Sequence, residues 1–213
     1  MGEAGELAPA GAPDKLLIGL TGNIACGKST VLARLAALGA GVIDADVVTR
    51  DLQRQGAPAY APMVAAFGPG ILQADGEIDR RALGNQVFAH PAALARLEAI
   101  VRPLVRDEIA RRLIAAPQRV VVIDAIGLLE SPLAALCDRI WVVTAPPEQQ
   151  VARLVATRGL REEEAWLRVR AQRPQAEKVA RADRVFDNSG SRAALLAHVD
   201  AAWAALQAAG GPA

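Results

Sequence analysis

Aromatic residues, cysteine and histidine are scarce in this sequence of 213 residues. Aromatic side chains make up 3% of the chain and hydrophobic residues 52%, so the core must consist mainly of Leu, Val, Ile and Ala. The two cysteines, Cys26 and Cys137, are expected to be reduced thiols, because a disulfide at Cys26 would lock a Gly-rich turn that ligands must enter. The two histidines, His90 and His198, are assigned no catalytic or metal-binding role.

The chain also lacks a large net charge and a long apolar run. Its formal net charge is +1, which argues against duplex DNA or an acidic membrane as a bulk electrostatic partner. No apolar run is long enough to span a bilayer, and residues 1–14 lack the basic start and apolar stretch of a secretory signal. We therefore expect a cytoplasmic protein without a nucleic-acid, membrane or obligate protein partner, and a disordered tail over residues 1–14.

Beyond this tail, short apolar runs alternate with helical patterns. Strands are predicted at 16–20, at a segment ending near Asp44, at 120–125, at 139–145 and, more weakly, at 184–188, and helices at 28–38, 46–54, 147–157 and 192–206. Buried strands separated by helices are typical of a parallel sheet covered by helices on both faces. The prediction is a single α/β domain over residues 15–213, with a three-layer parallel sheet.

Two intervals interrupt this alternation. Residues 55–118 contain helix starts at Asp79 and Pro91 but no convincing strand, which predicts a helical insertion on the sheet. Residues 158–182 are dense in charge and helical in pattern. They form either a pair of solvated helices or part of a mobile basic cover over bound phosphates, a lid to which we assign residues 150–182.

One motif has the spacing of a phosphate-binding loop (P-loop), with a predicted strand before it and a helix after it: Gly22, Asn23, Ile24, Ala25, Cys26, Gly27, Lys28, Ser29 and Thr30. Gly22 and Gly27 allow backbone conformations that turn N–H groups inward around an anion, and the helix presents its positive N-terminus there. Lys28 can reach the β- and γ-phosphate oxygens of a nucleotide, and the Ser29 hydroxyl can ligate Mg²⁺. The predicted fold is therefore of the P-loop NTPase type.

Acidic residues follow two of the predicted strands. Asp46 lies just past the strand that ends near Asp44, at the edge where open parallel sheets bind ligands. It is a candidate to accept a proton from an attacking hydroxyl or to hold Mg²⁺ through water, although Asp44 and Asp46 could instead cap the next helix. Arg50, one turn later, either pairs with Asp46 or binds a substrate anion. Asp124 ends the run "VVVID", which resembles the second Mg²⁺-associated motif of P-loop proteins.

The segment from Asp124 to Gly127 also matches the Asp-x-x-Gly element of GTPases, which raises the alternative of a nucleotide switch acting on a protein partner. GTPases carry a guanine-reading Asn-Lys-x-Asp element. The asparagines of this chain are Asn23, Asn85 and Asn188, and none is followed by Lys. The sequence therefore favours a kinase over a switch.

Longer strings resemble the dephospho-coenzyme A kinases from about Leu16 to about Leu206. The most specific of these strings are the stretch from "DADVVTR" to "VFAHP" and, near the C-terminus, the strings "QRPQAEK", "AD" and "DNSG". That family transfers the γ-phosphoryl group of ATP to the ribose 3′-hydroxyl of dephospho-coenzyme A, the last step of coenzyme A synthesis. The resemblance implies ATP, Mg²⁺ and dephospho-coenzyme A as ligands. The alternative is a related kinase for another nucleotide or small-metabolite hydroxyl, with acceptor choice residing in residues 55–118.

The resemblance also implies roles for matching positions. Residues 22–30 would hold the ATP phosphates and Mg²⁺, with Ser29 as metal ligand, and residues 55–118 would form the coenzyme-binding subdomain. Further roles would fall to Asp46 as general base, Arg50 and Asp124 at the substrate, Arg153 and Arg158 as lid contacts to phosphate, and Asn188 near the adenine. The chain departs from the family's usual residues at Asn23, Ala25, Cys26, Arg102 and Ile126.

Overall fold

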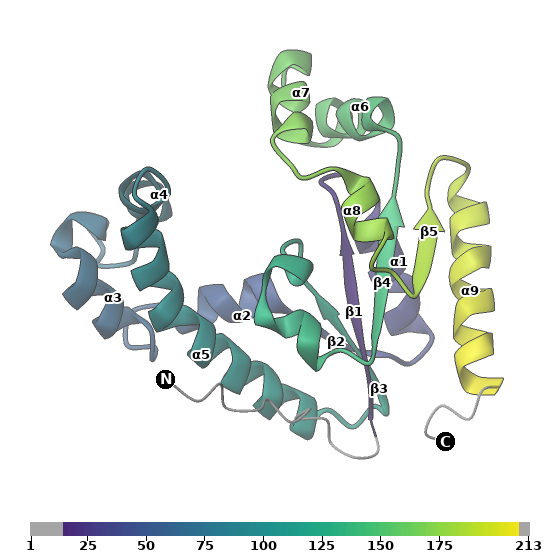
Figure 1. The fold of residues 1–213 in the computed structure, drawn as a ribbon, viewed down its shortest axis with the longest axis horizontal. Helices are drawn as coiled ribbons and strands as arrows, with labels where there is room; N and C mark the ends of the chain where they lie inside the picture. Colours follow the sequence, from purple (N-terminus) through teal and green to yellow (C-terminus); the bar gives the residue numbers. More distant parts are fainter. Residues whose placement is uncertain (1–14, 209–213) are drawn as a thin grey trace. The chain divides into compact units, whose positions relative to one another are not determined.

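The structure is a computed structural model that describes residues 15–208, so the predicted tail over 1–14 lies outside the described part (Figure 1). The chain divides into two compact units. One unit consists of Asp44–Ile114, and the other is formed by the chain before and after that segment. We call them the helical unit and the sheet unit and describe each by itself. No helix within residues 15–208 is both long and apolar enough to cross a membrane.

The sheet unit is built on five strands in the order β2-β3-β1-β4-β5. Their bounds are β1 Leu16–Gly22, β2 Gly41–Asp44, β3 Val120–Asp124, β4 Arg139–Thr144 and β5 Arg184–Asp187. β1 pairs in parallel with β3 and β4, and β4 pairs in parallel with β5. All five residues of β3 are buried, as expected for a parallel strand that is covered on both faces. These strands confirm the α/β fold class and every strand position predicted from the sequence.

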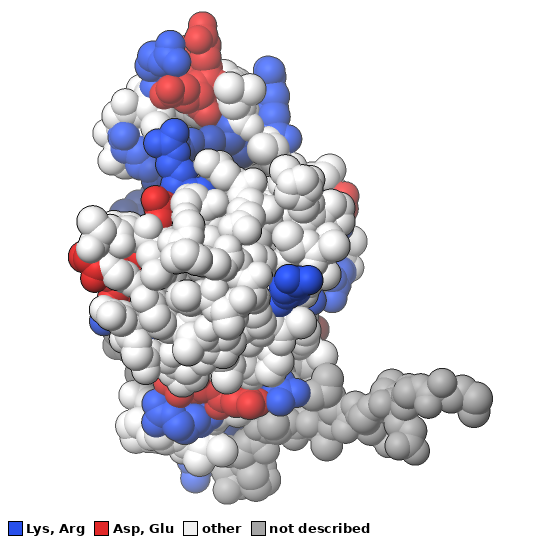
Figure 2. All heavy atoms as spheres, turned by 90° about the vertical axis from the view of Figure 1, so that its left-hand side faces the viewer, with Lys and Arg blue, Asp and Glu red and all other residues white. Residues whose placement is uncertain are grey.

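The sheet unit also contains α1 Lys28–Ala37, η2 Leu128–Glu130, η3 Pro132–Leu136, α6 Pro147–Arg158, α7 Glu162–Arg170, α8 Gln175–Val179 and α9 Arg192–Ala208. Its main core is aliphatic, with one aromatic contact in which Trp141 and Phe186 pack edge to face at 5.2 Å. α1 packs beside α9, and an ion pair between Arg34 and Asp200 at 2.6 Å joins the two helices. Charged side chains of both signs crowd over α7, at the top of Figure 2.

The helical unit contains α2 Ala45–Leu52, α3 Tyr60–Phe67, η1 Pro69–Ile71 and α4 Arg80–Phe88, with α5 Pro91–Ala115 running one residue past its end. Within it, α2 is tied to α3 by the hydrogen bond from the Ala59 amide to the Leu52 carbonyl. Arg112 of α5 pairs with Asp51 of α2 at 3.4 Å. The unit thus begins earlier than the predicted insertion over 55–118, because α2 packs with the helices that follow it.

Candidate active site

The P-loop joins β1 to α1 and depends on close backbone approaches. Gly27 has φ of 100°, and a Cβ there would lie 2.1 Å from Asn188 Nδ2. A Cβ on Gly22 would lie 2.5 Å from the Val143 carbonyl oxygen. Ala25 is left-handed at φ 55°, a conformation that glycine adopts more readily than alanine. The loop therefore adopts its turn even though only two of its residues are glycines.

Two side chains from distant parts of the chain hold this loop from outside. Asn188 Nδ2 donates to the Cys26 carbonyl at 2.8 Å. Arg153 Nη1 donates to the carbonyls of Ala25 and Cys26, each at 3.2 Å, and its Nη2 donates to the Asn188 carbonyl at 2.8 Å. Because these bonds engage carbonyls of the loop, they help to fix its conformation.

A cavity of about 400 Å³ adjoins the loop. It is lined by polar and basic residues that the sequence singled out, namely Gly27, Ser29, Thr30, Arg153, Arg158 and Asn188, together with Arg192. Such a lining combines hydrogen-bond donors with positive charge and suits an anionic ligand of nucleotide size.

Lys28 and Asp124 form an ion pair at the carboxyl ends of β1 and β3. Asp124 is 9% exposed, so its carboxylate neutralises the Lys28 ammonium in a largely dry setting. The Asp124 carboxylate and the Ser29 hydroxyl are oxygen ligands of the type that Mg²⁺ prefers. No cluster of three or more His, Cys, Asp or Glu side chains suited to a metal occurs within residues 15–208. The Asp124 carboxylate and the Ser29 hydroxyl fit a Mg²⁺ ion that shares its coordination with phosphates and water.

The cysteines are packing groups. Both are free, as predicted, and Cys26 is completely buried under the P-loop. Burial raises the pKa of the Cys26 thiol, and it raises that of Cys137 to about 12. Neither thiol is poised to act as a nucleophile.

The helical unit places Asp44, Asp46 and Arg50 around the first turns of α2. Asp44 is the N-cap and accepts the Val47 amide at 2.8 Å, which leaves Asp46 exposed in the first turn. Arg50 lines a cavity of about 670 Å³ together with Arg54, Gln73, Glu77 and Arg80. Burial, and then the charge of Arg50, lower the pKa of Arg80. Guanidinium groups that repel one another in this way favour an anionic ligand between them.

Residues 16–194 match the sequence pattern of one family, described as dephospho-CoA kinase. The chain belongs to the dephospho-CoA kinase family. This confirms the resemblance that its longer strings carry.

Curated relatives agree with this assignment, and solved structures agree with the fold. A dephospho-CoA kinase from Symbiobacterium thermophilum is 48% identical over 192 residues, which cover 89% of this chain and 80% of the relative. One from Geobacillus kaustophilus is 47% identical over 180 residues, covering 83% and 90%. A crystal structure from Thermus thermophilus matches with a TM-score of 0.79 at 35% identity, covering 90% of this chain and 98% of the other. A shikimate kinase from Bacteroides thetaiotaomicron, at 17% identity and a TM-score of 0.53, shares the fold.

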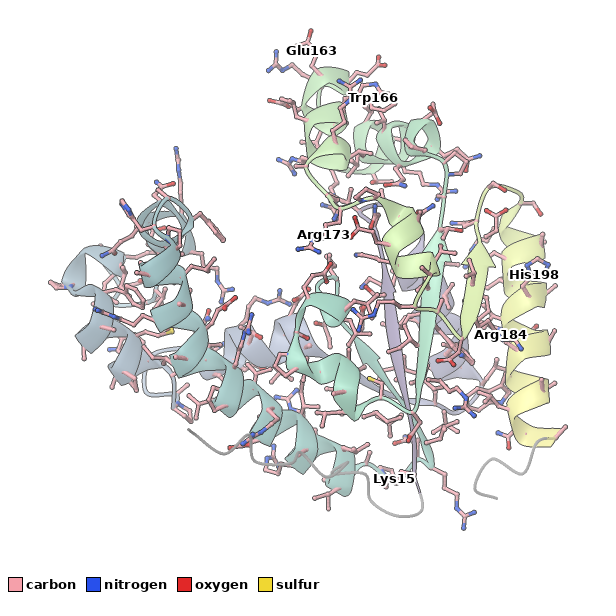
Figure 3. The ribbon with its side chains drawn as sticks, in the orientation of Figure 1. Lys15, Glu163, Trp166, Arg173, Arg184 and His198 are labelled. Atoms are coloured by element: carbon pink, nitrogen blue, oxygen red, sulfur yellow. The ribbon has the colours of Figure 1, made fainter. Side chains whose placement is uncertain are left out.

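Sequence reasoning placed residues 150–182 in the lid but did not predict the hydrogen bonds that connect the segment between α7 and α8 to the P-loop of this dephospho-CoA kinase family member. The Ile24 amide donates to Gln172 Oε1 at 2.7 Å, and Asn23 Nδ2 donates to the Arg173 carbonyl at 3.2 Å. Figure 3 shows Arg173 on this segment, below α7 with its Glu163 and Trp166. Lys178 of α8 is almost completely buried. The string "QRPQAEK" contributed to the resemblance to the family, but it does not by itself predict these contacts.

Proposed function

We propose that this chain transfers the γ-phosphoryl group of ATP to the ribose 3′-hydroxyl of dephospho-coenzyme A, giving coenzyme A and ADP. The observation that carries the proposal is a P-loop whose lysine is held by Asp124, in a chain that matches dephospho-CoA kinases along most of its length. No observation favours a different acceptor. We place the reaction in the cytoplasm.

The ATP site is assigned to the sheet unit. N–H groups of the P-loop would cradle the phosphates, and Lys28 would exchange its contact with Asp124 for phosphate oxygens. Mg²⁺, when bound with ATP, would offset charge on the β- and γ-phosphates, with Ser29 and Asp124 as its protein-side partners. Asn188 borders the cavity on the side assigned to adenine, and Arg158 is the lid residue assigned to phosphate.

Arg153 has a positional role within this assignment. Sequence reasoning linked it to phosphate contact, which stays a prediction. In the structure its guanidinium donates to three backbone carbonyls and to Gln149 Oε1, so its observed contacts shape the P-loop. We therefore assign it to holding the loop in its phosphate-binding conformation.

The acceptor site is assigned to the helical unit. The cavity beside Arg50 and Arg80 would bind anionic groups of dephospho-coenzyme A. Asp46 would take the proton of the 3′-hydroxyl as its oxygen forms a bond to the γ-phosphorus and the bond from that phosphorus to ADP breaks. Closure of the lid over residues 150–182 would exclude water, which otherwise competes with the 3′-hydroxyl.

The proposed function is tested by incubating the protein with ATP and Mg²⁺, with and without dephospho-coenzyme A, and weighing the products by mass spectrometry. An acceptor-dependent gain of one phosphate on the 3′-oxygen is expected. ATP binding with an unchanged acceptor would exclude this acceptor and leave the P-loop assignment in place.

The role of Asp46 is tested by Asp46→Asn, which keeps the size of the side chain but removes its basicity. Loss of a general base lowers turnover by about 10²–10⁴-fold. We expect this loss in kcat, measured with saturating substrates, and an unchanged affinity for ATP measured by calorimetry. Near-normal turnover would remove Asp46 as the base.

A further inference from the structure

A second buried lysine lies at the end of the sheet that carries the P-loop. The sequence contains only three lysines among its 24 basic residues, and two of them, Lys28 and Lys178, belong to the sheet unit's phosphate end. Lys178 is 5% exposed. It lies on α8, which contacts β1 and β4 beside their carboxyl ends (Figure 1).

Hydrogen bonds place the Lys178 ammonium close to the start of the P-loop. Its Nζ donates to the Ile126 carbonyl at 3.1 Å, and the Thr21 hydroxyl donates to the same oxygen at 3.0 Å. Thr21 directly precedes Gly22, and Ile126 lies two residues after Asp124. The Lys178 ammonium and the Thr21 hydroxyl therefore share one acceptor, the Ile126 carbonyl oxygen. This acceptor lies at the same edge of the sheet as the ion pair between Asp124 and Lys28.

The segment that carries Lys178 is attached to the loop and to the sheet at several points. Gln172 and Arg173 accept hydrogen bonds from Ile24 and Asn23 of the loop, and Gln175 Oε1 accepts the Ala145 amide just past β4 at 3.2 Å. These bonds fix the start of α8 against the phosphate end of the sheet. The position of Lys178 is thus set by the same structure that shapes the phosphate site.

Lys178 lines a cavity of about 60 Å³ with two carboxylates, Glu130 and Glu177, and two arginines, Arg173 and Arg181. Within residues 15–208, Asp124 pairs with Lys28, whereas no carboxylate forms an ion pair with Lys178. Burial lowers the pKa of Lys178, Glu130 opposes that shift, and Lys28 adds to it. A buried cation without an ion-pair partner is costly, and a bound anion would offset this cost.

We propose that Lys178 is a further catalytic residue, whose ammonium contacts the phosphoryl group during its transfer from ATP. This inference rests on the proposed function. The charge on the transferring group spreads over its equatorial oxygens, and a fixed cation in a dry site stabilises it more in the transition state than in bound ATP. Lys28 and Lys178 then supply two positive charges to the phosphoryl group.

The experiment compares Lys178→Met and Lys178→Gln with Arg181→Met. Arg181 is a matched control because its Nη1 donates to the Leu129 carbonyl at 2.8 Å, so it ties the same region to the loop after β3 through a backbone oxygen. Lys178→Gln removes the charge and keeps an N–H donor on a side chain one atom shorter. Lys178→Arg restores a cation.

Both neutral Lys178 variants are expected to lose about 10²–10³-fold in kcat, as when one transition-state donor is removed. Their affinity for ATP and their melting temperature should change little, and Lys178→Arg should recover part of kcat. Arg181→Met should lose far less turnover than the neutral Lys178 variants. In wild type, aluminium fluoride should tighten the binding of ADP with Mg²⁺ by mimicking the transferring group, and the neutral Lys178 variants should lose that gain.

A structural tether would give a different pattern. If Lys178→Gln keeps its kcat and still binds ADP more tightly with aluminium fluoride, the proposal is wrong. The proposal is also wrong if Lys178→Met lowers the melting temperature but keeps its kcat, which is the result expected of a structural tether. If wild type leaves dephospho-coenzyme A unphosphorylated, the proposed function fails, while the comparison of ADP with and without aluminium fluoride still decides the role of Lys178.

Discussion

Arg153→Met is the variant that most directly tests how the P-loop is held. Methionine keeps much of the length and apolar stem of arginine but removes all its donors. Four acceptors would lose a partner, namely the carbonyls of Ala25, Cys26 and Asn188 and the side chain of Gln149. We expect the loop to lose its preference for the phosphate-binding conformation.

The size of the effect follows from these contacts. A hydrogen bond from a charged donor contributes about 1.5–3 kcal/mol to stability, and Arg153 makes one short bond, to Asn188 at 2.8 Å, and three longer ones of 3.1–3.2 Å. Arg153 is only partly buried, so water replaces some of the lost bonds. We therefore expect a loss of about 2–4 kcal/mol in the free energy of unfolding. At about 2–4 °C per kcal/mol for a chain of this size, the melting temperature should fall by about 4–16 °C.

The assay is thermal unfolding followed by circular dichroism, combined with calorimetric titration of ATP. Arg158→Met is the control for stability, because Arg158 is also on α6 but is exposed. Arg153→Met should weaken ATP binding and lower the melting temperature, while Arg158→Met leaves the melting temperature unchanged. A fall of less than about 2 °C for Arg153→Met, with ATP affinity intact, would refute the positional role that the structure indicates.

Two further variants test backbone conformation and acid stability. Gly27→Ala should abolish ATP binding, because the new Cβ would lie 2.1 Å from the Asn188 side-chain nitrogen. Gly39→Ala is the control: Gly39 has φ of 104°, but no atom lies within 4 Å of the new Cβ, so this variant should retain ATP binding and lose only stability through backbone strain. Equal ATP affinity in the two variants would contradict this prediction. In α5, hydrogen bonds from two arginines lower the pKa of Glu108 from 4.5 to about 2, so its stabilisation is complete above pH 4.5 and is lost as the pH falls toward 2. Melting curves of Glu108→Gln should depend less steeply on pH across that interval, and an unchanged slope would show that Glu108 makes no such contribution.

The sequence by itself determined the strands, most helices and the family. The Val- and Ile-rich runs predicted β1, β3 and β4, because a strand buried on both faces must be apolar throughout. The spacing of Gly22, Gly27 and Lys28 predicted the P-loop, because its turn and its charge depend on residue types a few positions apart. These are local signals, and a linear pattern is enough to carry them.

Only the tertiary structure decided which distant residues support that loop. Arg153, Asn188 and Gln172 lie far from the P-loop in the sequence, and their local pattern does not predict which carbonyl or amide of the loop each will contact. The structure likewise assigned different roles to Asp44, the last residue of β2, and to Asp46, because Asp44 caps α2 by accepting the Val47 amide. The P-loop motif depends on the spacing of residues that are neighbours in the sequence. The hydrogen bonds that hold the loop, and the charges that surround it, come from residues that approach one another only after the sheet has formed.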